Sequence, residues 1–365
     1  MCRLIIFGTG GSAERLEELL RKDVNIIAYA DNDSSKWGKY RNERKIVSPN
    51  LIESFDYDYI AIASQYNETI YNQLLNMGLD INKIFQFNKY HTILYNPFEK
   101  RFDNYIRNID SIETLLTGIS YAETSVNETL LSKKIQKFSL ASQDLFFDYK
   151  IVEHILYNYT NNKIKYVIIG LCYYSFQYDM SLSGMKYKVS LYYDILKESH
   201  NYDYLNSDFK KQYDINNAIA IKLLDKNKNI TNKWVSKALS DLELDERIRV
   251  GKCQADIDCN KDYPETVKEN IKIFEKYLEL LKKHNIEPIV VVFPASKYYT
   301  NCFSKRIEDE FHSILNEFSQ NYSFQYLDYF RSNLFTDEDF MDVSHLNKNG
   351  AEKFTNILDR DIKWE

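Results

Sequence analysis

Short apolar runs alternate with amphipathic stretches along the first quarter of the chain. Apolar runs occupy residues 3–7, 24–30 and 57–63, and apolar positions at helical spacing follow the first and the third run. Short buried strands that alternate with helices are typical of a parallel sheet covered by helices on both faces. The pattern therefore predicts an α/β fold, with a Rossmann-like parallel-sheet domain over residues 1–90.

The same alternation returns further along the chain. Four more apolar runs are predicted to be strands: 112–117, 165–171, 288–293 and 324–327. Apolar positions at helical spacing from 265 to 284 predict a strong helix. We predict a second α/β domain over residues 111–365, with the polar and mostly helical stretch at about 186–261 as an insertion. Residues 91–110 show no clear period and contain an Asn-Pro step, which predicts a linker.

Length and charge narrow the class of protein. The chain has 365 residues, more than one ordinary core holds, which agrees with two domains. Its net charge is -6 and no long basic block occurs, so nucleic acid binding is not expected, because phosphate contacts need a concentrated positive surface. No apolar run reaches the roughly 18 residues of a membrane span, and the N-terminal run leads into a strand pattern without a signal peptide. We therefore expect a cytoplasmic protein without a membrane span.

The cysteines offer no metal-binding pattern. Five are present and no Cys-x-x-Cys pair occurs: Cys2, Cys172, Cys253, Cys259 and Cys302. Cys253 and Cys259 lack the second pair that would complete a zinc site. We expect free thiols in a reducing compartment and no metal centre.

A glycine-rich loop follows the first predicted strand. The motif Gly-x-Gly-x-x-Ala begins at Gly8 and continues through Gly10, Gly11 and Ser12 into a helix. Glycines here permit a tight turn and a close approach of the backbone, and a helix N-terminus offers free N–H groups to a phosphate. Asp31, at the end of the second strand, is placed to accept a ribose hydroxyl. Two interpretations stay open: a nucleotide or nucleotide-sugar site, or a turn that binds nothing.

Four short segments of the N-terminal region form a recognisable pattern: Ala-Asp-Asn-Asp at 30–33, Lys-Trp-Gly at 36–38, Ile-Val-Ser-Pro at 46–49 and Tyr-Asp-Tyr-Ile-Ala-Ile-Ala at 57–63. The pattern resembles the N-terminal domain of bacterial sugar O- and N-acyltransferases of the sialic-acid and bacillosamine type. It is also similar to Rossmann-like domains attached to sugar epimerases and polysaccharide enzymes. The acyltransferase resemblance implies that residues 1–88 bind the nucleotide end of a UDP-sugar, although the hexapeptide repeats of that family do not occur in this sequence.

An aspartate and a histidine stand three residues apart near the C-terminus, in the segment Asp-Val-Ser-His-Leu-Asn-Lys-Asn-Gly. On a tight turn, Asp342 and His345 can face one point, where the carboxylate orients the imidazole and the imidazole takes a proton from a serine hydroxyl. Ser120 follows a predicted strand and Gly118, which lets the chain turn sharply. Taken alone, Ser120 could be an ordinary N-cap serine. Together with the Asp–His pair it is predicted to be a nucleophile.

The Asp-x-x-His-Leu-Asn-x-x-Gly-Ala block and the Gly-x-Ser turn, in this chain order, resemble the SGNH or GDSL-like hydrolases over residues 112–358. The resemblance implies a flavodoxin-like α/β/α domain in which Ser120, Asp342 and His345 form a catalytic triad that requires no cofactor. The usual Gly-Asp-Ser is replaced here by Gly-Ile-Ser.

The middle blocks of that family supply a glycine and an asparagine to the oxyanion hole. The family glycine would fall near Ser142, and no Gly-x-x-Asn follows the run at 165–171. The resemblance therefore places oxyanion donors at the backbone N–H groups near Ser142, with Gln143 or Tyr174 in place of the asparagine. The chain is more similar to the D-alanine transfer protein of teichoic acid synthesis and to polysaccharide O-acetyltransferases than to simple lipases.

These resemblances imply acyl transfer to, or ester hydrolysis on, a glycan or glycan precursor in bacterial surface polysaccharide biosynthesis, such as capsule formation. The acceptor would be a sugar hydroxyl or water, and acetyl-CoA is one candidate donor. The alternative is a non-catalytic nucleotide-sugar or effector-binding protein on an SGNH scaffold. A hydrogen bond between the Ser120 hydroxyl and His345 would favour the enzyme.

Overall fold

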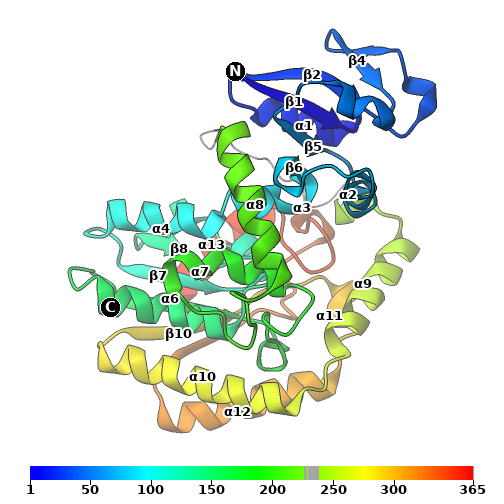
Figure 1. The fold of residues 1–365 in the computed structure, drawn as a ribbon. Coiled ribbons are helices and arrows are strands. Elements are labelled where there is room, and N and C mark those ends of the chain that lie inside the picture. Colours follow the sequence, from blue (N-terminus) through cyan, green and yellow to red (C-terminus); the bar gives the residue numbers. More distant parts are fainter. Residues whose placement is uncertain (226–227, 229–237, 365) are drawn as a thin grey trace. The chain divides into compact units, whose positions relative to one another are not determined.

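The chain forms two compact units, each built on its own sheet (Figure 1). The computed structural model describes residues 1–225, 228 and 238–364. The first unit comprises Met1–Pro97 and Asp203–Asn232, and the second comprises Phe98–Tyr202 and Lys233–Glu365. The α/β class predicted from the alternation of apolar runs is confirmed in both units.

The first unit contains a six-stranded sheet in the order β3-β4-β2-β1-β5-β6. Its strands are β1 (Cys2–Phe7), β2 (Val24–Ala30), β3 (Tyr40–Arg41), β4 (Arg44–Val47), β5 (Tyr59–Ile62) and β6 (Ile84–Phe85). Its helices are α1 (Gly11–Leu19), α2 (Asn67–Asn76), α3 (Phe87–Leu94) and α8 (Asp208–Leu223). Neighbouring strands are parallel except for the antiparallel pair β3 and β4. The three long apolar runs become β1, β2 and β5, which are buried and share a core with α2.

The second unit contains a five-stranded, all-parallel sheet in the order β11-β10-β9-β7-β8. Its strands are β7 (Thr114–Gly118), β8 (Ile135–Lys137), β9 (Tyr166–Leu171), β10 (Glu287–Val292) and β11 (Gln325–Asp328). Its helices are α4 (Pro97–Asn108), α5 (Ser120–Ser125), α6 (Leu145–Asn158), α7 (Ser190–Leu196), α9 (Leu244–Cys259), α10 (Pro264–Lys283), α11 (Lys297–Thr300), α12 (Lys305–Asn321) and α13 (Lys348–Asp361). Helix α6 packs against α10, and α5 packs against α13. Right-handed crossovers between parallel strands put these two pairs on opposite faces of the sheet.

The segment predicted to be a linker is helical. Residues 91–110 contain the end of α3 and the whole of α4. Three aromatic side chains of α4 are buried: Phe98, Phe102 and Tyr105. The three rings stand at i, i+4 and i+7, which is helical spacing, and they pack on Phe138. The sequence therefore carried a helical signal here that the interpretation as a linker missed.

The predicted insertion at 186–261 is helical in α7, α8 and α9, as expected, but its helices belong to different units. Helix α8 belongs to the first unit, where Asn216 Oδ1 accepts a hydrogen bond from the backbone N–H of Gln86 (2.7 Å). Residues 226–227 and 229–237 of the insertion lie outside the described residues.

The short strands β3, β4 and β8 were not predicted, because a few residues that include arginine or lysine do not form an apolar run. Within the ranges that the structure describes, no helix has both the length and the apolar character that crossing a membrane requires.

Candidate active site

Ser120 lies directly after a sharp turn at the end of β7. Gly118 ends the strand with φ +130°, and a Cβ there would lie 2.5 Å from the carbonyl oxygen of Gly170 on β9. Only glycine fits, because it has no Cβ and tolerates a positive φ. The N–H of Gly118 donates to the buried Asp148 carboxylate (2.8 Å), and Ser120 is the first residue of α5. The turn presents Ser120 at the C-terminal edge of the sheet, where open parallel sheets bind ligands.

The three side chains predicted to act together are joined by hydrogen bonds. Ser120 Oγ lies 2.9 Å from Nε2 of His345, and Nδ1 of His345 lies 3.0 Å from each carboxylate oxygen of Asp342. Asp342 Oδ1 also accepts the backbone N–H groups of Ser344 and His345, both at 2.8 Å. The Asp-x-x-His spacing thus forms a turn that brings an acid and a base to a serine 225 positions away in the chain.

The charge on Asp342 determines which ring nitrogen of His345 carries a proton. Burial raises the pKa of Asp342, but the hydrogen bonds and charge of His345 and the backbone N–H groups outweigh it, so that the pKa is lowered. A carboxylate only accepts, so Nδ1 of His345 carries the proton and Nε2 is left to accept the Ser120 hydroxyl proton. The ring of Tyr121 stacks on the imidazole, with centroids 4.9 Å apart and planes at 15°, and holds its orientation.

These groups open onto a cavity of about 610 Å³. One part of its wall is apolar and includes Leu239 together with Val250 and Ile257 of α9, while Asp258 and Lys261 supply polar groups. A cavity of this size lies within the range that takes a small molecule, roughly 300–1,000 Å³.

The predicted oxyanion residues separate into two groups. Ser142 and Tyr174 border the cavity. Gln143 Oε1 instead accepts the Tyr192 hydroxyl (2.8 Å), and its Nε2 donates to Asp148 (2.6 Å). Contrary to the prediction, the Gln143 amide therefore serves the scaffold, tying α6 to α7 beneath the β7 turn, and is not available as an oxyanion donor.

Two parts of the cavity lining were not predicted from the sequence: Tyr121 and the residues of helix α9. A tyrosine directly after the candidate nucleophile carries little information in a chain that contains 30 tyrosines. Helix α9 reaches the cavity from more than a hundred residues along the chain, and nothing in its local pattern marks that destination.

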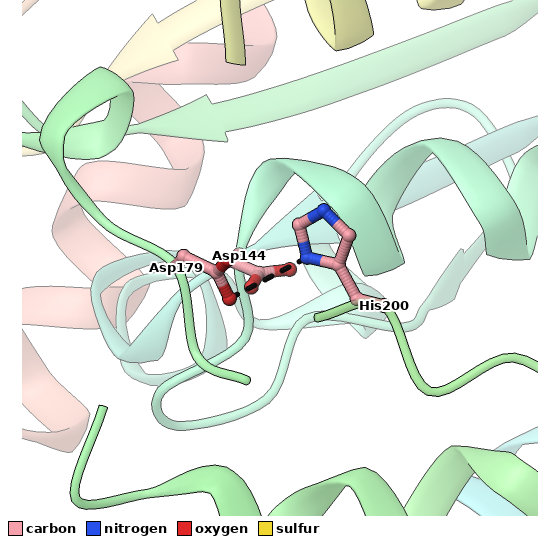
Figure 2. A group of neighbouring side chains, drawn as sticks. All are labelled: Asp144, Asp179 and His200. Carbon is pink, nitrogen blue, oxygen red and sulfur yellow. Dashed lines mark ion pairs between the residues drawn. The ribbon is translucent and has the colours of Figure 1, made fainter. Parts of the chain in front are cut away.

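A second polar cluster lies in the same unit. Asp144, Asp179 and His200 bring ligand-type atoms within 4.8 Å of one another, an arrangement that could hold a metal ion (Figure 2). The carboxylates already have donors, however. Asp144 accepts the backbone N–H groups of Phe147 (3.1 Å) and Met180 (2.7 Å), and Asp179 accepts two further backbone N–H groups. A protonated His200, with Nδ1 3.4 Å from Asp179, can supply the positive charge that buried carboxylates need, so we assign this cluster to the scaffold.

The first unit has its own glycine turn and its own cavity. Gly8 follows β1 with φ +115°, and an added Cβ would lie 2.4 Å from the carbonyl oxygen of Ala63. A cavity of about 550 Å³ opens beside this turn, and all five residues predicted to bind a nucleotide line it: Gly8, Gly10, Gly11, Ser12 and Asp31. A Cβ at Gly10 or Gly11 would meet no atom within 4 Å, so the loop is open to a ligand.

The Asp31 carboxylate has two partners beside the loop. Its Oδ2 accepts the Thr9 hydroxyl (2.5 Å) and the Lys36 ammonium (2.8 Å). Burial raises the pKa of Asp31, but these hydrogen bonds outweigh it and the pKa is lowered. Lys36, which sequence reasoning missed, also lines the cavity. A ligand hydroxyl would therefore share Asp31 with Lys36, whose positive charge lies beside the glycine loop.

Known proteins share a stretch of sequence with the first unit and a remote structural likeness with the chain. Residues 1–85 match a family model described as C2185-like, N-terminal. No curated protein matches the chain. Among solved structures, a "putative acylhydrolase" of Bacteroides fragilis NCTC 9343 is 10% identical with a TM-score of 0.36, covering 72% of this chain and 93% of that one. A "putative platelet activating factor" of Streptococcus pneumonia is 11% identical with a TM-score of 0.36, covering 80% and 98%.

Proposed function

We propose that the second unit is a serine-dependent acyltransferase or esterase that acts on a glycan or glycan precursor. The observation that carries the proposal is the hydrogen-bonded series Ser120–His345–Asp342 at the edge of a parallel sheet, open to a cavity. In this series the imidazole can take the serine proton as the oxygen attacks a carbonyl. The Ser120–His345 hydrogen bond favours this enzyme over a non-catalytic scaffold.

In the proposed reaction, Ser120 Oγ attacks the acyl carbonyl carbon while its proton passes to Nε2 of His345. The tetrahedral intermediate then collapses to an acyl-serine, and His345 returns the proton to the departing oxygen or sulfur atom. Water or a sugar hydroxyl attacks the acyl-serine with His345 again as base, and Ser120 regains its proton. Asp342 keeps Nδ1 protonated and stabilises the imidazolium in both halves of the reaction.

The cavity wall supports a glycan as one substrate. Tyr174 and Tyr178 bring aromatic side chains to it, and Gln254 and Asp258 bring hydrogen-bonding groups. Apolar surface combined with a few polar groups suits a sugar ring, which has C–H faces and hydroxyls. We place the reaction in surface polysaccharide biosynthesis, with acetyl-CoA as a candidate donor for the transferase form.

Covalent labelling tests the proposal. The full-length protein is treated with a fluorophosphonate probe, digested, and searched by mass spectrometry for the adduct. We expect one adduct on Ser120, and we expect the Ser120→Ala variant to lose both the adduct and the hydrolysis of p-nitrophenyl acetate. A folded wild-type protein that shows neither adduct nor turnover would refute the enzyme and favour effector binding.

A second proposal concerns the first unit, which we infer binds a nucleotide or nucleotide-sugar. The observation that favours it is that the glycine loop, Asp31 and Lys36 line one cavity. Helix α1 begins at Gly11, and the N–H groups and positive dipole end of such a helix attract phosphate. Calorimetry of the full-length protein with UDP, UDP-sugars, CDP-linked compounds and NAD tests it. If no compound binds at millimolar concentration, the loop is a structural turn.

A further inference from the structure

The loop that follows β8 reaches the cavity at Ser142 in an unusual backbone conformation. Ser142 has φ +69°, in the left-handed region that non-glycine residues rarely occupy. Its neighbours hold it there: Glu123 accepts the Ala141 N–H (2.7 Å), and the Tyr178 hydroxyl donates to the Ser142 carbonyl oxygen (3.0 Å). A conformation that costs energy persists only when its surroundings fix it, and such positions concentrate at functional sites.

Lys188 completes this set of contacts. Its Nζ donates to the Ala141 carbonyl oxygen (2.8 Å) and to the Ser142 hydroxyl oxygen (3.2 Å). Lys188 comes from the short 3-10 turn before α7. Burial lowers the pKa of its ammonium group, and the Glu123 carboxylate partly opposes this by favouring the charged form.

The chemistry of the two side chains fixes the role of each atom. An ammonium group can only donate hydrogen bonds, so the Ser142 hydroxyl must accept the bond from Lys188. The hydroxyl proton then points elsewhere, either to the nearby Tyr178 hydroxyl or into the cavity that Ser142 and Ser120 both line. A hydroxyl that accepts from a cation is polarised, which makes it a stronger donor.

We propose that the Ser142 hydroxyl, held and polarised by Lys188, donates a hydrogen bond to the oxyanion that forms when Ser120 attacks an acyl group. The inference rests on the proposed acyl-transfer function and adds two residues to it, Ser142 as a catalytic side chain and Lys188 as its positioning residue. The attack places negative charge on the carbonyl oxygen, and donors already aimed at that oxygen stabilise the transition state more than the ground state. The backbone N–H groups of Ser120 and Ser142 would share the same oxygen.

The Ser142→Gly variant tests the role of the hydroxyl without changing the conformation of the loop. Glycine prefers the observed φ and keeps the backbone N–H, so the fold and the loop are retained while the hydroxyl is lost. Loss of one oxyanion donor lowers kcat by about 100- to 1,000-fold, and we expect kcat to fall in this way for p-nitrophenyl acetate with little change in KM. Undiminished kcat in Ser142→Gly would overturn the inference.

Lys188 is tested with a matched pair. Lys188→Met should lower kcat by about tenfold or more, as expected when a charge-assisted hydrogen bond is lost, and Lys188→Arg should recover part of it. Lys186→Met, an exposed lysine on the same loop, is the control and should leave kcat unchanged. Wild-type kcat in Lys188→Met would remove Lys188 from the site.

The proposed function and this inference fail in different ways. A wild-type protein without a Ser120 adduct and without turnover refutes both. A wild-type protein that is labelled at Ser120, together with a Ser142→Gly variant that is labelled and turns over at the same rates, refutes only the role of the Ser142 hydroxyl.

Discussion

In both units, a glycine with a positive φ lets the chain turn sharply from a strand into a helix. Gly8 and Gly118 have φ of +115° and +130°, and a Cβ on either would lie 2.4 or 2.5 Å from a carbonyl oxygen of the neighbouring strand region. Each turn opens a cavity at the C-terminal edge of a parallel sheet. The residues that follow differ. Ser120 comes two positions after Gly118, whereas Gly8 is followed by Thr9 and two glycines.

This difference separates the contribution of the fold, which is access to the sheet edge, from that of the side chains, which is the chemistry of the site. The turn gives access to the sheet edge in both units, but the chemistry depends on a partner from a distant segment. In the second unit that partner is His345, whose Nε2 meets Ser120. In the first unit it is Lys36, which meets Asp31 and Thr9 and leaves the glycine loop open. The first arrangement suits the proposed proton transfer, whereas the second leaves a lysine ammonium beside an open loop, as the proposed nucleotide site requires.

The largest effect on esterase kcat is expected for Asp342, and none is expected for Asp31, the aspartate of the other cavity. Asp342→Asn removes the carboxylate that orients His345 and favours the wrong tautomer, so esterase kcat should fall about ten-thousand-fold. Asp31→Asn is the matched control and should leave esterase kcat unchanged. Both variants are assayed on p-nitrophenyl acetate. An Asp342→Asn variant that keeps more than about a tenth of wild-type kcat would mean that Asp342 does not orient the base, since a tenfold loss is only about 1.4 kcal/mol.

The two glycine turns should be equally intolerant of a Cβ. Gly118→Ala and Gly8→Ala each force a methyl group against backbone and strain a positive φ, so each should lower the free energy of unfolding on the order of 3 kcal/mol. Gly10→Ala is the control, because its Cβ would meet nothing within 4 Å. Calorimetric unfolding of the three variants measures this. A stable Gly8→Ala protein would break the parallel between the turns.

The sequence allowed the central strands and the hydrogen-bonded meeting of Ser120, His345 and Asp342 to be predicted, for identifiable reasons. Strands β7 and β9 are buried along their whole length, and β1 and β2 over their C-terminal residues, so each appears in the sequence as a short and mostly apolar run. Asp342 and His345 lie three residues apart, so one local turn relates them to each other. Their meeting with Ser120 could be inferred only from the family resemblance.

The rest depended on contacts that local patterns do not record. Lys36 and Lys188 are ordinary charged residues in sequence. Lys36 contacts Thr9, 27 positions away, as well as Asp31, and Lys188 contacts Ser142, 46 positions away. Gln143 stood beside the right loop, but its amide is turned toward Asp148 and Tyr192. A side chain's direction is set by the packing around it, which one-dimensional spacing does not contain.

A smaller effect is expected for the anion site. Gly10→Val adds a branched side chain where a phosphate would approach, and Lys36→Met removes the cation beside the loop. Each should weaken nucleotide or nucleotide-sugar binding by about tenfold, the change that about 1.4 kcal/mol produces, without altering esterase kcat. Calorimetry with the best ligand of the wild-type protein measures it. Unchanged affinity in both variants would place the ligand outside this cavity.

The smallest effect concerns the ion pairs that hold the loops of the two units. The Asp31 carboxylate, whose pKa is lowered, stays ionised between about pH 5 and 8, whereas histidine titrates in that range. His200 is buried in the second unit, stacked on Phe146, and faces Asp179, Asp144 and Glu269. Burial lowers the pKa of His200, but its hydrogen bond to Asp179 and the surrounding carboxylates outweigh this and raise it.

The sign of the pH dependence follows from that direction. A histidine whose pKa is raised on folding stabilises fully below its unfolded value of about 6.5, and the contribution is lost as pH rises through the folded pKa. Burial also raises the pKa of Asp144, to about 6, which adds a loss in the same direction between about pH 4 and 6, while Asp179, with its pKa lowered to about 2, stays ionised throughout. The second unit should therefore lose stability as the pH rises from 6 to 8.

Calorimetric unfolding of wild type, His200→Gln and Asp144→Asn at pH 5 to 8 tests this. His200→Gln should be less stable at pH 6 and should flatten the slope above pH 6, because no titrating group remains opposite Asp179. Asp144→Asn should keep that slope and lose the one below pH 6. A His200→Gln protein with the wild-type slope above pH 6 would show that this histidine is neutral in the folded state. The cluster would then hold its loop by hydrogen bonds alone.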